Sequence, residues 1–356
     1  MKVALILNAN MHCSPYVKIY SKILDEIKIE YDFLAWDRSK IGETGGTFFQ
    51  KGFPYGNGNK LSWVFNYYAY SRFLKKQIKA NGYDKLVVFG PQVGFFLFLF
   101  LKRRYNKRFC FDYRDIFIEQ LVPKIFKRFL KISALNVISS PGFRPYLPND
   151  FEYIQSHNFD IVTLEEGLDK YINDGNFDRK SINILTIGSI RDFDENYQLV
   201  KSLYNRPNYI IKFIGRPDQA GVRLQKACSD ERQTNVEFTG FYKDEDEPQI
   251  INDADFINIF RPDKIKCSST FTNRFYYALI YKKPMLVTRG SLEGSYVEEY
   301  NLGLALDDCS QLDEKLQLFI SDFNYEEFNE NCNKLLKLFL SDYMVFRQRL
   351  IDFLYS

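Results

Sequence analysis

The chain has 356 residues, which is longer than one typical domain and fits two. Its formal net charge of +3 provides no argument for a nucleic-acid partner. The six cysteines are scattered without a C-x-x-C pair, and the histidines are His12 and His157, so the sequence argues against a structural zinc site, a disulfide framework and a histidine-rich metal site. We therefore expect a cytoplasmic protein without a metal.

The first half of the chain alternates buried, strand-like runs with helical patterns. Met1 and Lys2 lead straight into the first run, so no signal peptide is expected, and the most apolar run, 94–101, is too short to span a membrane. The opening β-α-β unit lacks the G-x-G-x-x-G of nicotinamide-binding folds, which argues against a dehydrogenase. Residues 42–59 are rich in Gly, Asn and Thr and are long enough for a functional loop. Predicted strands are 2–7, 31–36, 85–89, 108–111 and 135–138, and predicted helices are 15–27, 61–81, 93–101 and 116–130.

The second half repeats the pattern after a polar connection at 158–181. Predicted strands are 182–188, 210–215, 236–240, 256–260, 285–288 and 304–306, and residues 323–354 are strongly helical. Repeated strand-then-helix units imply parallel sheets with helices on both faces. We therefore predict an α/β protein with two Rossmann-like domains, at 1–157 and 182–335.

The segment 270–284 contains a helix that is suited to binding a phosphate. Thr270, Thr272 or Asn273 can cap the helix, and Pro284 ends it. A short buried strand follows, so the N-terminus of the helix is expected at the open edge of a sheet. The free N–H groups and the dipole of such an N-terminus favour an anion, and Arg274 adds a positive charge.

The run R-F-Y-Y-A-L-I-Y-K-K-P at 274–284 resembles the donor-binding segment of retaining GT-B glycosyltransferases of the family 4 type. Arg274 matches the basic position of that segment, and Lys283 with Pro284 matches its end. Tyr277 stands where the family has a glutamate, and Lys282 stands where it has a glycine. An ordinary capped helix of any α/β domain also accounts for this run, so that alternative stays open.

The resemblance continues over 182–307 and implies where a nucleotide-sugar would bind. Arg191 is implied as a diphosphate ligand, although Glu195 replaces a lysine of the family's pattern, and a surface pair of Arg191 with Asp192 or Asp194 is the alternative. Glycine turns let backbone approach the base, and an aromatic side chain beside them either stacks on the base or belongs to the core. The implied donor residues are Gly188, Arg191, Gly215, Gly240, Phe241, Tyr242, Thr272, Asn273, Arg274, Tyr277, Gly294, Ser295 and Glu298.

Two of these implied contacts depend on the loop that follows residue 289. A backbone nest at Gly294 and Ser295 would hold the sugar or a phosphate. Glu298 or Glu299 falls in the family's second glutamate region. A solvated helix face is the alternative for these two glutamates.

The first half contains the candidate acceptor residues. Asp112-Tyr113-Arg114-Asp115 is predicted to follow a strand directly and resembles the D-x-R-D segment of bacterial glycosyltransferases that build surface polysaccharides. Asp112 or Asp115 would bind acceptor hydroxyls and Arg114 would hold them, with a structural Arg–Asp pair as the competing explanation. His12, in the first loop, is a further catalytic candidate, whereas His157 is expected to be structural.

The resemblance implies a GT-B fold in which the two domains face a central cleft and a last helix, 336–356, packs back on the first domain. It implies transfer, with retention, of a sugar from a UDP- or GDP-linked donor, without a cofactor, to a saccharide acceptor in capsule or O-antigen synthesis. The acceptor would be lipid-linked if the protein lies at the inner face of the plasma membrane. The basic clusters 102–108 and 124–131 flank apolar residues in a way that suits such an anionic surface, although solvated helix ends explain them too. A sugar-nucleotide epimerase and a non-catalytic partner of an active transferase stay open as alternatives.

Overall fold

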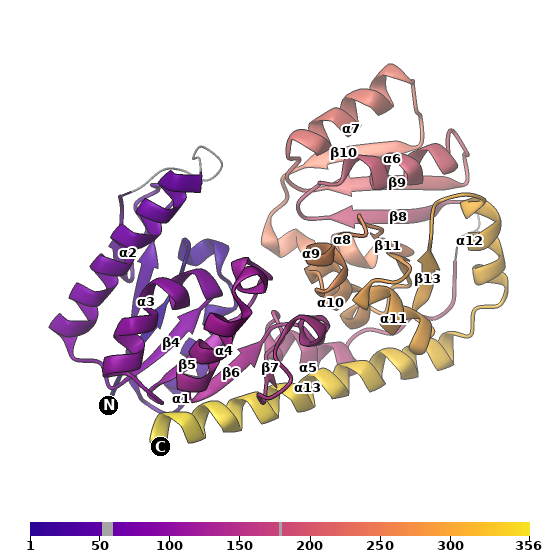
Figure 1. Ribbon diagram of the computed structural model, residues 1–356. Helices are drawn as coiled ribbons and strands as arrows, with labels where there is room; N and C mark the ends of the chain where they lie inside the picture. Colours follow the sequence, from indigo (N-terminus) through magenta and orange to yellow (C-terminus); the bar gives the residue numbers. More distant parts are fainter. Residues whose placement is uncertain (52–59, 178–179) are drawn as a thin grey trace. The chain divides into compact units, whose positions relative to one another are not determined.

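The computed structural model describes residues 1–51, 60–177 and 180–356 (Figure 1). The chain divides into two compact units: unit 1 comprises Met1–Asp160 and Ser341–Ser356, and unit 2 comprises Ile161–Leu340. The long last helix, α13 (Tyr325–Tyr355), contributes residues to both units. The segment predicted as a connection, 158–181, lies largely in unit 2 and contains a helix, α5 (Ile161–Asp169).

Unit 1 is built on a seven-stranded parallel sheet in the order β3-β2-β1-β4-β5-β6-β7. Apolar side chains of α2, α3 and α4 pack on one face of this sheet, and those of α1 and the end of α13 pack on the other. The strands are β1 (Lys2–Ile6), β2 (Glu30–Trp36), β3 (Thr47–Phe49), β4 (Lys85–Phe89), β5 (Phe109–Tyr113), β6 (Leu135–Ile138) and β7 (Ile154–Gln155). The helices are η1 (Met11–Cys13), α1 (Val17–Glu26), α2 (Lys60–Asn81), α3 (Pro91–Arg104), η2 (Ile118–Leu121), α4 (Pro123–Ile132) and η3 (Pro141–Tyr146).

Unit 2 is built on a six-stranded parallel sheet in the order β10-β9-β8-β11-β12-β13. Helices α6, α7 and α12 bury their apolar sides against one face of this sheet. The strands are β8 (Ile182–Ile187), β9 (Tyr209–Ile214), β10 (Val236–Gly240), β11 (Phe256–Ile259), β12 (Met285–Thr288) and β13 (Gly303–Leu306). The helices are α6 (Phe193–Ser202), α7 (Gln219–Asp230), η4 (Asp244–Asp246), α8 (Glu247–Asn252), α9 (Ile265–Ser268), α10 (Asn273–Ile280), α11 (Leu292–Glu299) and α12 (Leu312–Ser321).

The two parallel sheets covered by helices confirm the predicted α/β class with two Rossmann-like domains, whereas the cleft between them stays a prediction. Several local predictions were wrong. Strand β5 runs to Tyr113, so Asp112 lies inside a buried strand and does not follow one. The single helix predicted at 116–130 is two helices, because Pro123 lacks a backbone N–H and begins α4. The predicted loop at 42–59 contains β3, and its residues 52–59 lie outside the described residues.

The structure adds two observations on membranes and metals. Over the described ranges 1–51, 60–177 and 180–356, no helix combines the length and the apolar character that a membrane-spanning segment requires. In the same ranges, no group of three or more His, Cys, Asp or Glu side chains is arranged to hold a metal ion.

Candidate functional site

The carboxyl ends of the unit 2 strands meet at one edge of the sheet, which is where open α/β sheets bind ligands. Three of the predicted glycines lie there with positive φ: Gly188 (92°), Gly215 (135°) and Gly240 (77°). A Cβ atom on Gly215 would lie 2.0 Å from the carbonyl oxygen of Gly188, so only a glycine lets these two turns pass each other. A Cβ atom on Gly188 or on Gly240 would meet nothing within 4 Å, so the backbone at these two turns has open space beside it.

Helix α10 begins at the same edge. Thr272 caps it, as its hydroxyl oxygen accepts a hydrogen bond from the Phe275 N–H at 3.3 Å. Arg274 reaches across the ends of β8 and β11: its Nε donates to the Ile187 carbonyl at 2.7 Å, its Nη2 to the Ser189 carbonyl at 2.8 Å and its Nη1 to the Asn258 carbonyl at 3.4 Å. Asn273 is exposed in the first turn. The predicted cap residue and the predicted arginine therefore lie at one end of one helix.

Three arginines concentrate positive charge at this edge. Burial, together with the charges of Arg261 and Arg191, lowers the pKa of Arg274 to about 10. Arg274 is still charged at neutral pH, but its charge is disfavoured, so an anion bound nearby would be stabilised by all three guanidinium groups. The side chain of Arg191 is exposed, and no ion pair of Arg191 with Asp192 or Asp194 is present in the described residues.

The loop that carries Arg191 is held by buried amides. The Asn196 side chain donates to the carbonyls of Arg191 and Asp192, and its Oδ1 accepts from Asn258 of β11 at 3.0 Å. Asn258 also donates to the Thr186 hydroxyl at 2.9 Å. This chain of hydrogen bonds fixes the backbone at Arg191 against the sheet and leaves its side chain to solvent.

A buried glutamate that the sequence did not reveal lies beside α10. Glu293, in the first turn of α11, is 3% exposed and accepts from the Thr272 N–H at 2.7 Å and from the Thr272 hydroxyl at 2.8 Å. Its Oε2 lies 3.9 Å from Arg261, and burial raises its pKa. The resemblance implies Glu298 or Glu299 in this region, but Glu298 pairs with Arg289 at 3.0 Å on the surface. Ser291 caps α11, and an N-cap serine followed by an acidic residue in the first turn was the sequence signal for this helix start.

The predicted backbone nest at Gly294 and Ser295 is not available to a ligand. The Gly294 N–H donates to the Ser291 hydroxyl at 2.9 Å, and the Ser295 N–H donates to the Ser291 carbonyl at 2.9 Å. A Cβ atom on Gly294 would lie 2.5 Å from the Thr288 carbonyl oxygen, so this glycine serves the close packing of α11 on β12. This prediction was wrong because the segment forms the first turn of a helix.

Tyr242 and Tyr277 converge on a carboxylate of α8. The Tyr242 hydroxyl donates to Glu247 Oε2 at 2.9 Å. Burial raises the pKa of Tyr277, and its interactions with Glu247, a side-chain hydrogen bond among them, raise it further. Burial and the interactions with Glu247 also raise the pKa of Tyr242, and the charge of Arg274 opposes this rise, so Tyr242 lies within electrostatic reach of Arg274. Phe241, which lies between the end of β10 and Tyr242, is 78% exposed and offers its ring to solvent.

In unit 1, the structure favours the competing explanation for Asp112. Asp112 is fully buried and accepts two hydrogen bonds from Arg114, at 2.8 and 2.7 Å, and one from the Tyr20 hydroxyl at 2.6 Å. Burial alone would lower the pKa of Arg114, but the charge of Asp112 raises it above the ordinary value. The Arg114 guanidinium also lies 4.3 Å from the ring centroid of Tyr16. The predicted acceptor pair is thus a buried ion pair that ties β5 to α1, while Asp115 is exposed.

His12 lies at the carboxyl end of β1 and is oriented by a glutamate. Its Nδ1 lies 2.6 Å from Glu43 Oε1, and its Nε2 lies 3.1 Å from the Cys13 sulfur. Backbone N–H groups of Met11 and His12 also donate to Glu43, at 2.8 and 2.9 Å. Burial alone would raise the pKa of Glu43, but these hydrogen bonds hold it below the ordinary value. A carboxylate on Nδ1 fixes the tautomer in which Nε2 accepts a proton.

The other histidine has a structural role. His157 is buried, and its Nε2 lies 3.0 Å from Asp342 Oδ2 within unit 1. Burial lowers the pKa of His157 although Asp342 opposes this effect. The pair connects the segment after β7 to α13, as the sequence led us to expect of a structural histidine.

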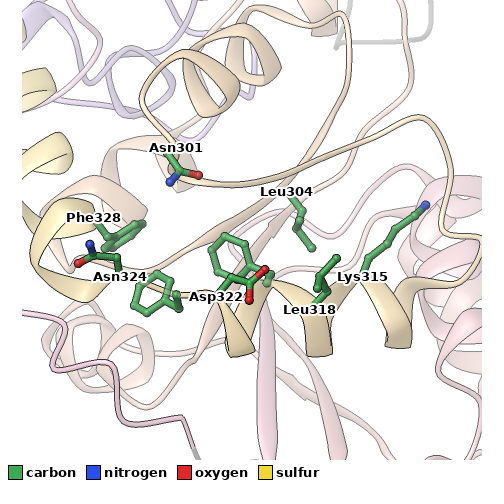
Figure 2. Close-up of a pocket in the computed structure, with 9 residues that line it drawn as sticks. Asn301, Leu304, Lys315, Leu318, Asp322, Asn324 and Phe328 are labelled. Atoms are coloured by element: carbon green, nitrogen blue, oxygen red, sulfur yellow. The ribbon is translucent and has the colours of Figure 1, made fainter.

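A cavity of about 290 Å³ lies elsewhere in unit 2 (Figure 2). It lies along α12 and at the amino end of β13, away from the carboxyl ends of the strands. None of the predicted site residues lines it. Its lining residues are Asn301, Leu304, Lys315, Leu318, Phe319, Asp322, Phe323, Asn324 and Phe328.

The fold of two Rossmann-like units, which GT-B proteins share, recurs in solved structures along nearly the whole chain. Sucrose-phosphate synthase from Thermosynechococcus elongatus is 13% identical, with 100% of both chains covered and a TM-score of 0.74. HepE of Anabaena, in complex with UDP and glucose, is 14% identical, with 100% of both chains covered and a TM-score of 0.64. UDP-N-acetylglucosamine 2-epimerase from Rickettsia bellii is 13% identical, with 97% of both chains covered and a TM-score of 0.58. No protein-family model and no curated protein matches the chain.

Proposed function

We propose that the chain is a GT-B glycosyltransferase that moves a sugar from a UDP- or GDP-linked donor to a saccharide acceptor. The observation that carries this proposal is the cluster of Arg191, Arg261 and Arg274 at the N-terminus of α10, beside the glycine turns of β8 and β9. A diphosphate needs such a concentration of guanidinium and N–H donors, because charge develops on it as the sugar leaves. The likeness to HepE, which binds UDP and glucose, supports a UDP-sugar.

The remaining donor contacts follow from the same edge. We propose that the ring of Phe241 stacks on the base; its exposure and its position after β10, beside the open turn at Gly240, support this. The guanidinium groups and the dipole of α10 supply the positive charge that a metal supplies in other transferases, so no cofactor is proposed. The family 4 type and retention of configuration are proposed from the resemblance of 274–284.

On the acceptor side, we propose His12 as the group that accepts a proton from the acceptor hydroxyl. Its Nε2 is oriented by Glu43 on the opposite ring nitrogen, and the side chain is half-exposed at the carboxyl end of β1. A bacterial capsule or O-antigen glycan, with a lipid-linked acceptor, is the pathway proposed from the resemblance.

A non-catalytic GT-B partner subunit is the second candidate. The observation that favours it is the hydrogen bond of Tyr277 to Glu247, because a hydroxyl engaged by the protein is not available to a donor. Release of nucleoside diphosphate from a sugar nucleotide by the isolated chain would exclude this candidate.

The proposal is tested by thermal shift and calorimetry of the chain with UDP, GDP, CMP and dTDP sugars. Arg191→Ala should weaken binding of the preferred nucleotide by about 1.5–3 kcal/mol, the usual contribution of hydrogen bonds to charged groups. Arg289→Ala is the matched control, because Arg289 follows β12 at the same edge but is paired with Glu298 and Asp307. Unchanged affinity in Arg191→Ala, or an equal loss in Arg289→Ala, would place the diphosphate elsewhere.

A further inference from the structure

Three helices of unit 1 carry basic residues and no acidic ones. Helices α2, α3 and α4 lie side by side on one face of the sheet, as shown by the ring pairs Tyr67–Phe96 and Phe98–Phe129 at 5.6 and 6.2 Å (Figure 1). None of them contains Asp or Glu. We call their outer side the basic face, and its basic residues are Arg72, Lys75, Lys76, Lys79, Lys102, Arg103, Arg104, Lys124, Lys127, Arg128 and Lys131.

The charge of the basic face is not neutralised within the described part of the chain. Of the basic residues just named, Lys127 is the one with an ion pair there, to Asp150. The whole chain has 48 basic and 45 acidic residues, so its near-neutral total hides a strongly positive side of unit 1. Such a segregated charge creates a local potential that attracts an anionic partner.

The basic face also exposes large apolar side chains. Leu61, Phe65 and Tyr68 lie one helical turn apart on the outer side of α2, with exposed fractions of 68%, 69% and 53%. Leu121 in η2 is 79% exposed, and Trp63 of α2 lies 5.3 Å from Phe117, which immediately precedes η2. The start of α2 and the loop before α4 therefore present one apolar patch beside the basic residues.

Along α2, the exposed apolar residues come first and the basic residues follow. Its outer side begins with Leu61, Phe65 and Tyr68 and continues with Arg72, Lys76 and Lys79 at the same helical spacing. On a surface that meets a bilayer, exposed apolar side chains can enter the headgroup region while neighbouring Lys and Arg side chains attract anionic headgroups. A nucleic acid would explain the charge but not the exposed leucines, which have no flat surface for a base to stack on.

We propose that the basic face of α2, α3 and α4 docks on an anionic lipid bilayer, with Leu61, Phe65 and Leu121 entering the headgroup region. The proposal goes beyond the transferase activity and does not depend on it. Its charge component weakens with salt because headgroup attraction is screened, whereas its apolar component does not. Docking would hold unit 1 against the surface where a lipid-linked substrate is found.

Vesicle sedimentation with the full chain tests the proposal. We expect binding to phosphatidylcholine vesicles that contain phosphatidylglycerol, and much weaker binding to phosphatidylcholine alone. Each basic residue near an anionic surface contributes about fivefold in affinity, so Arg72→Gln/Lys76→Gln/Lys79→Gln should weaken binding on the order of a hundredfold. Leu61→Ser/Phe65→Ser should weaken it further at high salt. Val222→Ser/Lys226→Gln on α7 of unit 2, where both residues are also exposed, is the matched control and should bind like the parent chain.

Quenching of Trp63 fluorescence by brominated phosphatidylglycerol distinguishes insertion from simple charge attraction. Trp63 is half-buried at the apolar end of α2, so docking by the basic face brings it close to the acyl chains. Quenching in the parent chain that is lost in Leu61→Ser/Phe65→Ser supports the proposal. Equal binding to both kinds of vesicle, an equal loss in the α7 control, or binding to heparin without binding to anionic vesicles would overturn it.

Discussion

Replacing Tyr277 by phenylalanine removes a hydroxyl that bonds Glu247 and keeps the ring. Burial and Glu247 together raise the pKa of Tyr277, so the hydroxyl is neutral and donates at pH 7. A hydrogen bond to a charged group contributes about 1.5–3 kcal/mol. Glu247 is half-buried and keeps its bond from Tyr242, so we expect a loss near the lower end, about 1.5 kcal/mol of unfolding free energy.

Scanning calorimetry and titration with UDP measure the two consequences separately. A loss of 1 kcal/mol lowers the Tm of a domain of this size by roughly 2–4 °C, so Tyr277→Phe should lower the transition of unit 2 by about 3–6 °C. UDP affinity should stay within about twofold, because the hydroxyl is engaged by the protein. Tyr242→Phe is the matched variant, since its hydroxyl reaches the same carboxylate. The double variant should lose more than the sum, because Glu247 then has neither tyrosine as a donor.

The opposite result would refute this reasoning. If Tyr277→Phe keeps its Tm but binds UDP at least tenfold more weakly, the hydroxyl contacts the donor and does not stabilise the fold through Glu247. Tyr277 would then stand in for the glutamate that the family has at this position, and the non-catalytic candidate would lose its support.

Two further predictions concern other parts of the molecule. In steady-state kinetics, His12→Ala should lower the transfer rate by about 10²–10⁴-fold, the contribution of general base catalysis, and Glu43→Gln should lower it less. UDP affinity should stay near the parent value in both variants, and Cys13→Ser should keep the parent activity. Burial lowers the pKa of Lys282 to about 8, below the pKa of a lysine in the unfolded chain, so the unfolded chain binds more protons above pH 8 and stability rises with pH there. Relative to Lys282→Met, the unfolding free energy measured by chemical denaturation should therefore increase by about 2 kcal/mol between pH 8 and about pH 10. The same pH dependence of the unfolding free energy in both proteins would contradict this.

The strands were predictable because they are buried runs of apolar residues in a repeated order. The prediction failed where a buried polar residue interrupts such a run. Asp112 reads as the start of a loop, yet it completes β5 because Arg114 and Tyr20 satisfy its carboxylate. Tyr20 lies on α1, 92 residues earlier in the chain, so no local pattern reveals this compensation.

The candidate site was predictable where its signals are local. The glycine turns, the cap at Thr272 and the arginine two residues later lie within short segments, and the structure brings them to one edge. Glu43 was missed because it reaches His12 from a segment 31 residues away. Glu247 was missed although its partner Tyr242 is only 5 residues away. Glutamates are common on protein surfaces, so the sequence alone does not show which of them will accept a hydrogen bond from a distant side chain.

The two departures of α10 from the family's pattern are accommodated in different ways. Lys282, where the family has glycine, adopts a φ of 53° at the end of the helix, and its buried ammonium donates to the Gly167 carbonyl of α5 at 2.6 Å. The left-handed conformation that suits glycine is therefore retained at the cost of a buried charge. Tyr277, where the family has glutamate, reaches the carboxylate of Glu247 on α8. The carboxylate beside the arginine cluster is Glu293 of α11, whose Oε2 lies 3.9 Å from Arg261, so the loss of the glutamate at 277 is not by itself evidence that the site has lost its function.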